Sequence, residues 1–295
     1  MLKRTLFFST PMYLSLKDNQ LVTHVKERPE EKRTIPIEDI GFVVLEHQMI
    51  NITLPLLNAL VENNVAVILC SGAMLPNAML LTLDSNTIQG ELFRAQVDAS
   101  EPLKKNLWKQ TVEVKIENQA RLLNKLGRDG DKLKPLYMNV KSGDVDNREG
   151  VAAKIYWDEL FGKDFLRDRN GVPPNNLLNY GYTILRAAVA RALSGSGLLP
   201  SLGIFHRNRY NAFPLADDIM EAYRPFVDEI VFGLYCSGEA ELTKDVKAQL
   251  LRVLFADTVF DKVSRPLEVG LSLTTASLAK CFSGKHKKLS YPVLV

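Results

Sequence analysis

The sequence predicts an α+β fold, with a small β-rich domain over residues 1–80 followed by a larger all-helical domain over residues 91–295. Two observations support this division. Short apolar or alternating runs, which are typical of strands, dominate the first part. Longer segments with helical periodicity dominate the remainder. The polar run Asp84-Ser85-Asn86 falls between the two patterns, so residues 81–90 are expected to form a linker.

The β-rich part contains two unbroken apolar runs, residues 41–45 and 65–69, which are typical of buried strands. Shorter runs predict further strands at residues 6–9, 13–16, 21–25 and 79–83. One helix is expected between the two buried strands. Thr53 is suited to cap that helix, Pro55 lies in its first turn, and Asn63-Asn64 ends it.

Helical periodicity recurs through the second part of the chain. It predicts helices at residues 91–99, 108–126, 149–160, 176–193, 215–231 and 244–260. In the fifth of these, Pro225 cannot donate a hydrogen bond to the carbonyl of Glu221. We therefore expect this helix to kink at Glu221.

Composition excludes several classes of protein. The 37 basic and 34 acidic residues give a net charge of +3, which does not fit a histone-like coat of charge. DNA binding would require clustered basic residues, and residues 280–288 are locally basic. The three cysteines form no C-x-x-C pair, so we expect a reducing cytoplasm rather than a zinc site or disulfides. We expect neither a signal peptide nor a membrane span, because the apolar N-terminal run is interrupted and no stretch is long enough.

Glu149 opens a predicted helix rich in small residues. It shares a helical face with Ala153, Tyr156 and Leu160, where a neighbouring helix could approach closely. A carboxylate on such a face is costly to bury unless it is paired or bound to a metal. The alternative is a capping box, with Asp146 as the cap and Glu149 as the third helical residue.

His206 ends a glycine-rich run that begins at Gly195. The run resembles a loop that delivers His206 and then the basic residues Arg207 and Arg209. Cations beside the histidine suit a site that handles phosphates. The alternative is a structural histidine followed by a solvated basic loop.

Three acids share one predicted helical face. Asp217, Asp218 and Glu221 recur at spacings of three and four residues, opposite an apolar stripe. Like charges at these spacings repel each other, and a cation would relieve the repulsion. Oxygen ligands with one imidazole suit a hard divalent ion, Mg²⁺ or Mn²⁺. The alternative is a solvated acidic face.

Four separated motifs agree with one known family. They are Glu149-Gly-x-Ala-Ala-x-x-Tyr156, Asn179-Tyr-Gly-Tyr182-x-x-Leu185, Gly203-x-x-His206 and Asp218-x-x-Glu221. Their order and spacing resemble the CRISPR-associated integrase and endonuclease of spacer acquisition, the large subunit found in all such systems. The phrase from Leu215 to Pro225 resembles the type II version most.

The resemblance implies an N-terminal β-sandwich, a helical catalytic domain and a homodimer. It also implies partners: DNA, a small ferredoxin-like CRISPR adaptation protein, and other proteins of the same locus. Glu149, His206 and Glu221 match the family's catalytic metal ligands, and Asp218 matches an auxiliary acid. The family often has aspartate where Glu221 stands, so this ligand has a longer arm here.

The implied activity inserts foreign DNA fragments as new spacers into a CRISPR array, by attack of a 3′ hydroxyl on a phosphodiester. Arg207 and Arg209 are candidates for DNA phosphate contacts. Two alternatives stay open on the residues themselves. One is a stand-alone metal-dependent nuclease that acts on branched DNA in repair, and the other is a non-catalytic DNA-binding scaffold.

Overall fold

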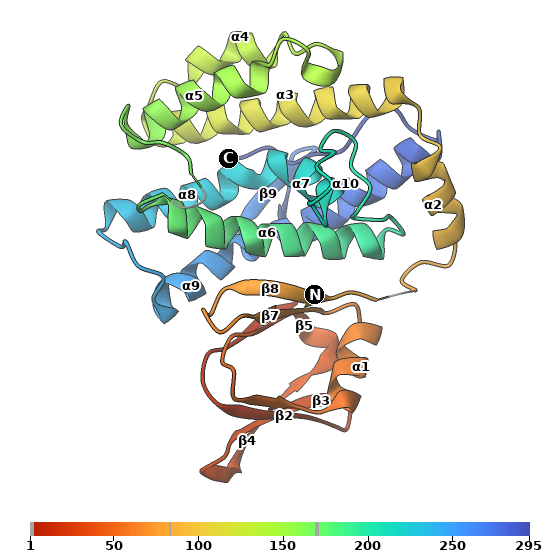
Figure 1. Cartoon of the computed structure of the whole chain (residues 1–295), viewed down its shortest axis with the longest axis vertical. Helices are drawn as coiled ribbons and strands as arrows, with labels where there is room; N and C mark the ends of the chain where they lie inside the picture. The colour runs from red at the N-terminus through yellow and green to blue at the C-terminus, as the bar shows by residue number, and fades with distance from the viewer. Residues whose placement is uncertain (1–2, 83, 169–170) are drawn as a thin grey trace. The chain divides into compact units, whose positions relative to one another are not determined.

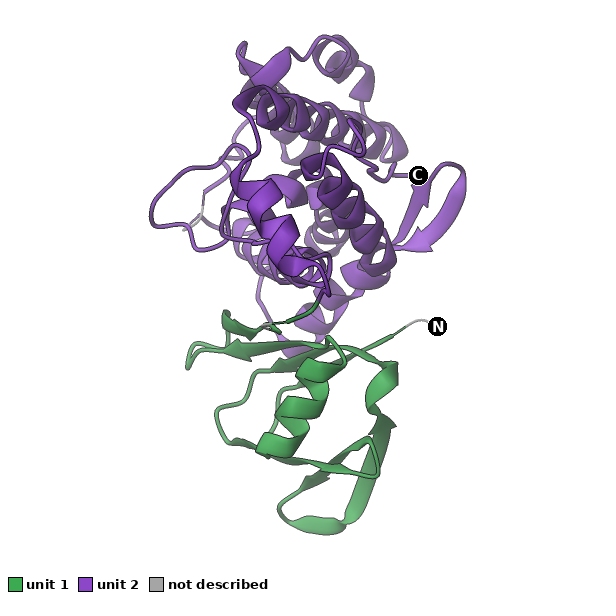
Figure 2. Cartoon of the chain, turned by 90° about the vertical axis from the view of Figure 1, so that its right-hand side faces the viewer, with its two compact units in different colours: residues 1–85 green, residues 86–295 purple. Residues whose placement is uncertain are grey.

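A computed structural model describes residues 3–82, 84–168 and 171–295 of the chain. It divides into two compact units, residues 1–85 and residues 86–295, which Figure 2 colours separately. No helix among the described residues is both long and apolar enough to cross a membrane.

Unit 1 contains two four-stranded sheets. The first has the order β1-β5-β7-β8, in which the first three strands are parallel and the last is antiparallel. Its strands are β1 (Arg4–Phe8), β5 (Ile40–Leu45), β7 (Ala66–Cys70) and β8 (Pro76–Leu80). The second has the order β4-β3-β2-β6, antiparallel except for the parallel pair β2 and β6. Its strands are β2 (Met12–Lys17), β3 (Gln20–Val25), β4 (Arg28–Pro36) and β6 (Ile50–Ile52).

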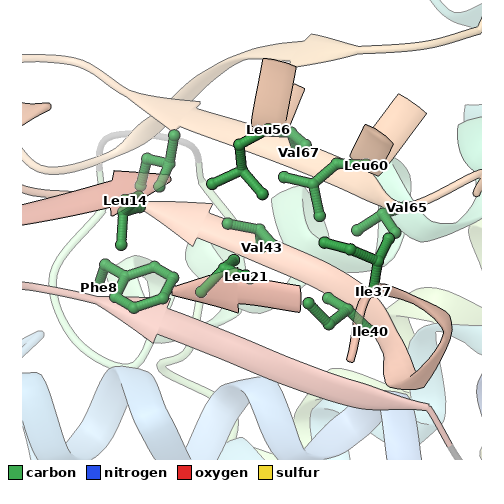
Figure 3. Close-up of a cluster of buried hydrophobic side chains, with 11 residues drawn as sticks. Phe8, Leu14, Leu21, Ile37, Ile40, Val43, Leu56, Leu60, Val65 and Val67 are labelled. Atoms are coloured by element: carbon green, nitrogen blue, oxygen red, sulfur yellow. The ribbon is translucent and has the colours of Figure 1, made fainter. Parts of the chain in front are cut away.

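One apolar cluster joins both sheets and the helix α1 (Leu54–Glu62) (Figure 3). Leu14 and Leu21 come from the second sheet, Val43 and Val67 from the first, and Leu56 from α1, and all five are buried. Apolar faces buried against each other in this way define a sandwich. The expected β-sandwich-like N-terminal region is therefore confirmed.

Two strands of unit 1 were not predicted. Strand β4 has the sequence RPEEKRTIP, and most of its residues are exposed. Its charges hide the strand periodicity, and they suit an edge of a sheet, where charge discourages pairing with other chains. Strand β6 has only three residues, too few for a pattern.

Unit 2 is built around two long helices, α3 (Glu101–Lys125) and α6 (Asn175–Gly195). The chain between Pro214 and Cys236 packs against both of them (Figure 1). It consists of α7 (Pro214–Met220), the 3₁₀ turn η4 (Glu221–Tyr223) and α8 (Arg224–Cys236). The expected kink at Glu221 is confirmed as this 3₁₀ turn, which precedes Pro225.

The remaining helices and 3₁₀ turns of unit 2 pack around this centre. They are α2 (Gln89–Val97), η2 (Gly130–Leu133), α4 (Lys134–Tyr137), η3 (Ser142–Asp144), α5 (Arg148–Phe161), α9 (Lys244–Leu251), η5 (Arg252–Phe255) and α10 (Leu267–Phe282). Helix α3 begins seven residues before the predicted 108, because Ser100 caps it and Pro102 occupies its first turn.

The second unit is not all-helical, and the predicted helix over residues 244–260 is wrong in its last part. Helix α9 ends at Leu251, and a hairpin follows, made of β9 (Asp257–Phe260) and β10 (Val263–Pro266). Asp261 and Lys262 form its turn with positive φ. Val259 also pairs with Val293, so contact with the distant C-terminal segment favours the strand.

Candidate metal site

Helix α5 begins with two local caps that orient Glu149. The carboxylate of Asp144 accepts the backbone N–H groups of Arg148 and Glu149 at 2.8 and 3.0 Å. Asn147, with a left-handed φ of 51°, accepts the N–H of Gly150 at 3.3 Å. The capping box with Asp146 as the cap, which was the alternative interpretation of Glu149, is wrong, because Asp144 and Asn147 cap the helix instead.

The loop before His206 is fastened to Asp218. One carboxylate oxygen accepts the N–H groups of Ile204 and Phe205 at 2.7 and 3.0 Å, and the other accepts that of His206 at 3.1 Å. Gly203 permits this approach, since a Cβ there would lie 2.8 Å from Asp218 Oδ2. Asp218 itself is fully buried in α7.

The imidazole of His206 is held on two sides. Its Nδ1 lies 2.5 Å from Asp218 Oδ1. The buried ring of Trp108 lies edge-on to the imidazole and stacks on Phe205 at 4.1 Å between centroids. When Nδ1 carries the proton and donates to Asp218, Nε2 presents its lone pair. A carboxylate behind a histidine in this way is the usual arrangement around metal-binding imidazoles.

Electrostatics place His206 in the field of both glutamates. The hydrogen bond with Asp218 raises the pKa of His206 most, and partial burial opposes that rise. The charges of Asp218, Glu221 and Glu149 raise this pKa further. The charges of both glutamates therefore act on the imidazole, although the three residues lie far apart in sequence.

The three acids of the predicted face do not stay together. Asp217 lies apart from the other two: it pairs with Arg186 at 2.7 Å and accepts a hydrogen bond from Asn211 at 2.7 Å. Asp218 and Glu221 are buried. The alternative of a solvated acidic face is therefore wrong for these two carboxylates.

Glu149 and Glu221 meet at one lysine. Lys115 Nζ lies 2.5 Å from Glu149 Oε1 and 2.6 Å from Glu221 Oε2, so these two oxygens are no more than about 5 Å apart. Arg224 Nε donates to Glu221 Oε1 at 2.8 Å. Burial alone would raise the pKa of Glu221, but the charges of Arg224 and Lys115 outweigh it and lower the pKa to about 2.

Lys115 and Arg224 were not among the residues expected from the sequence. Lys115 does leave a signal, because it stands three residues after Val112 and seven after Trp108 on the buried face of α3. A lysine at a core position is rare unless a carboxylate pairs with it. That pattern could have pointed to a buried acid across from α3.

The donor set suits a divalent ion. Two carboxylates and one imidazole are ligands that Mg²⁺ or Mn²⁺ accept. Glu221 Oε2 is buried and accepts no hydrogen bond from the described residues, although Lys115 lies beside it. The ammonium of Lys115 is thus a stand-in cation between two expected ligands. Within the described residues, no three acidic, histidine or cysteine side chains form a ready-made metal cluster.

Beside His206 the surface is hollowed. A hollow of about 410 Å³ is lined by Lys104, His206, Arg207, Arg209 and Phe282, among others. Arg207 pairs with Glu101 at 2.6 Å, whereas Arg209 lies over the ring of Tyr210. Basic side chains therefore lie beside His206, one of the three expected ligands.

A two-unit chain with a β-sandwich and a helical unit is the architecture of one class of CRISPR-associated proteins. The family model described as CRISPR associated protein Cas1 matches residues 6–268. The chain therefore belongs to the Cas1 family, as its sequence motifs predicted.

Individual relatives agree with this assignment. The chain is 41% identical to the CRISPR-associated endonuclease Cas1 of Neisseria meningitidis over 255 residues, which cover 85% of this chain and 83% of the relative. The expected enzyme class, an endonuclease of a CRISPR system, and the resemblance to a type II relative are confirmed.

Two solved structures share the fold. A casposase bound to its integration product matches with a TM-score of 0.77 at 21% identity, covering 98% of this chain and 92% of the casposase. A chain of a Cas6-RT-Cas1–Cas2 complex matches with a TM-score of 0.72 at 19% identity, covering 97% of this chain and 35% of the other.

Proposed function

We propose that this Cas1 protein is a metal-dependent endonuclease and integrase that inserts foreign DNA fragments as new spacers into a CRISPR array. One observation carries the site: two carboxylates from different helical segments converge on a single cation, and the charges of both raise the pKa of an imidazole that a buried acid orients. We assign Glu149, His206 and Glu221 as the ligands of Mg²⁺ or Mn²⁺.

A divalent ion bound there would supply polarisation of a phosphoryl oxygen and stabilisation of charge on the leaving oxygen. The protein's own residues supply the positioning. Asp218 holds the His206 ring through Nδ1, which would leave Nε2 to hold the ion, and Asp144 fixes the first turn that carries Glu149. Arg224 keeps Glu221 ionised.

The reaction is a transesterification. The 3′ oxygen of the incoming fragment forms a bond to phosphorus, and the bond from that phosphorus to the 3′ oxygen of the repeat strand breaks. The attacking hydroxyl loses its proton, and the leaving 3′ oxygen gains one. Hydrolysis follows the same course when water takes the place of the hydroxyl, which accounts for endonuclease activity at one site.

The partners follow from the chemistry and the family. DNA is the proposed substrate, and Arg207 and Arg209, which line the hollow beside His206, are the candidates to contact its phosphates. We propose a homodimer and a small ferredoxin-like adaptation protein as the assembly, together with other proteins of the same locus. The fold shared with a chain of a Cas6-RT-Cas1–Cas2 complex supports an assembly with other Cas proteins.

A strand-transfer assay tests the proposal. Purified protein is mixed with a short duplex carrying free 3′ ends, a supercoiled plasmid with a repeat array, and Mg²⁺ or Mn²⁺, with and without the small partner. We expect covalent joining that requires the metal. The variants E149Q, H206A and E221Q should lose joining at least about 100-fold.

Glu241→Gln is the matched control, because it removes an exposed carboxylate ahead of α9 and should join as well as the unaltered protein. Metal-dependent cutting without joining would replace the integrase by the repair nuclease. DNA binding without any reaction, even with the partner, would favour the scaffold. Full activity of H206A would remove His206 from the site.

A further inference from the structure

Lys115 lies where a cation belongs in the proposed site. Its side chain is only 9% exposed, and it projects from the middle of α3 between the segments that carry Glu149 and Glu221. Both carboxylate contacts are 2.6 Å or shorter. The guanidinium of Arg224 contacts Glu221 through Oε1, whereas Lys115 contacts Oε2. Arg224 therefore does not occupy the position of Lys115 between the two carboxylates.

Two carboxylates this close, Glu221 buried and Glu149 partly buried, repel each other when no cation lies between them. The ammonium of Lys115 removes that repulsion and fixes both oxygens at once. Mg²⁺ binds oxygen ligands at about 2.0–2.1 Å, so an ion bound to the same two oxygens needs the space that Nζ occupies. The ammonium and the metal ion therefore exclude each other from this position.

We propose that Lys115 is an internal counter-cation that keeps Glu149 and Glu221 together before metal binds and that must leave its place between them when metal binds. This inference rests on the proposed function. It makes Lys115 a positioning residue that competes with the metal, so that its charge stabilises the metal-free protein and weakens metal affinity.

The test compares Mn²⁺ binding and thermal unfolding at pH 8, without DNA, for the unaltered protein, K115M and K125M. Lys125 is the matched control, since it lies on the same helix and pairs with one acid, Glu229, at 2.6 Å. We expect K115M to bind Mn²⁺ at least about tenfold more tightly by calorimetry. Its midpoint of unfolding should be lower than that of the unaltered protein without metal and should rise more with metal.

Lys125→Met should leave Mn²⁺ affinity unchanged. If K115M does not fold, K115Q serves instead, because its amide can still donate to one carboxylate without carrying charge. A folded K115M or K115Q that binds Mn²⁺ no more tightly than the unaltered protein overturns the inference and leaves the proposed site intact. Failure of the unaltered protein to bind Mn²⁺ overturns the site, and the inference with it.

Discussion

The imidazole of His206 meets the carboxylate of Asp218 at 2.5 Å, and this contact decides which ring nitrogen faces the site. The same carboxylate accepts three backbone N–H groups from the loop that delivers the histidine. One buried acid therefore fixes the backbone, the ring orientation and the tautomer together. Burial raises the pKa of Asp218 above its usual value, and the hydrogen bonds from His206 and Phe205 offset only part of that rise.

We therefore predict that D218N weakens Mn²⁺ binding by about 10- to 100-fold, because an amide cannot accept all these hydrogen bonds. Calorimetric titration with Mn²⁺ measures the effect. Asp217→Asn is the control, since the neighbouring acid pairs with Arg186 instead. Equal affinity in D218N and the unaltered protein would contradict the assigned role.

Gly203 gives a second prediction about the same loop. An added Cβ would lie 2.7 Å from the carbonyl oxygen of His206 and 2.8 Å from Asp218 Oδ2. Neither atom can move without disturbing the imidazole ring of His206, so G203A should weaken Mn²⁺ binding. It should also lower the midpoint of thermal unfolding by several degrees, since each kcal/mol of lost unfolding free energy lowers it by about 2–4 °C.

Gly233→Ala is the control for this change. Gly233 lies within α8, and no described atom outside its own helix neighbourhood lies within 4 Å of a Cβ placed there. Alanine should be neutral or slightly stabilising at that position. Were G203A to behave like G233A in both measurements, close packing of the loop would not be what holds His206.

The sequence alone indicated the individual residues of the candidate site but not their pairing. Glu149, His206 and Glu221 stood out because each broke its local pattern, and the family resemblance ordered them. Lys115 did not stand out, although it follows Val112 and Trp108 at helical spacing, because one lysine in a helix as polar as α3 is unusual only once that face is known to be buried. Contacts between α3, α5 and η4 are long-range, and no local pattern encodes them.

The fold shows the same limit. Strands with apolar faces, such as β5 and β7, were predicted because burial on both faces leaves a continuous apolar run. Strand β9 was read as helix, since its pairing with β10 and with Val293 depends on the far end of the chain. Tertiary contact outweighed local propensity there.

Arg209 offers a prediction about DNA. Its guanidinium lies over Tyr210, whereas Arg207 is already paired with Glu101. We predict that R209Q lowers DNA affinity more than R207Q and reduces the salt slope of binding by about one. Fluorescence anisotropy at several salt concentrations measures this. The control for loss of charge alone is K244Q, because Lys244 is exposed. If K244Q lowered DNA affinity as much as R209Q does, a specific contact between Arg209 and DNA would be ruled out.

Asp228 carries the clearest pH dependence in the second unit. It is fully buried on α8 and accepts hydrogen bonds from the hydroxyl groups of Tyr156, at 2.8 Å, and Tyr182. Burial raises the pKa of Asp228 to about 6 from the usual 3.8, although both hydrogen bonds oppose the rise. The folded protein therefore holds this proton more tightly than the unfolded chain does.

It follows that Asp228 contributes stability fully below about pH 4 and loses that contribution as pH rises through about 6. The loss amounts to about 3 kcal/mol of unfolding free energy for a shift of this size. Urea unfolding of the unaltered protein and of D228N between pH 4 and 7 measures this loss. The unfolding free energy of the unaltered protein, relative to that of D228N, should fall as pH rises across this window. The neighbouring change E229Q removes a partly exposed acid and should preserve the trend. Parallel curves for D228N and the unaltered protein would mean that Asp228 stays ionised in the folded state, held by Arg224 and Arg167 more strongly than burial opposes its charge.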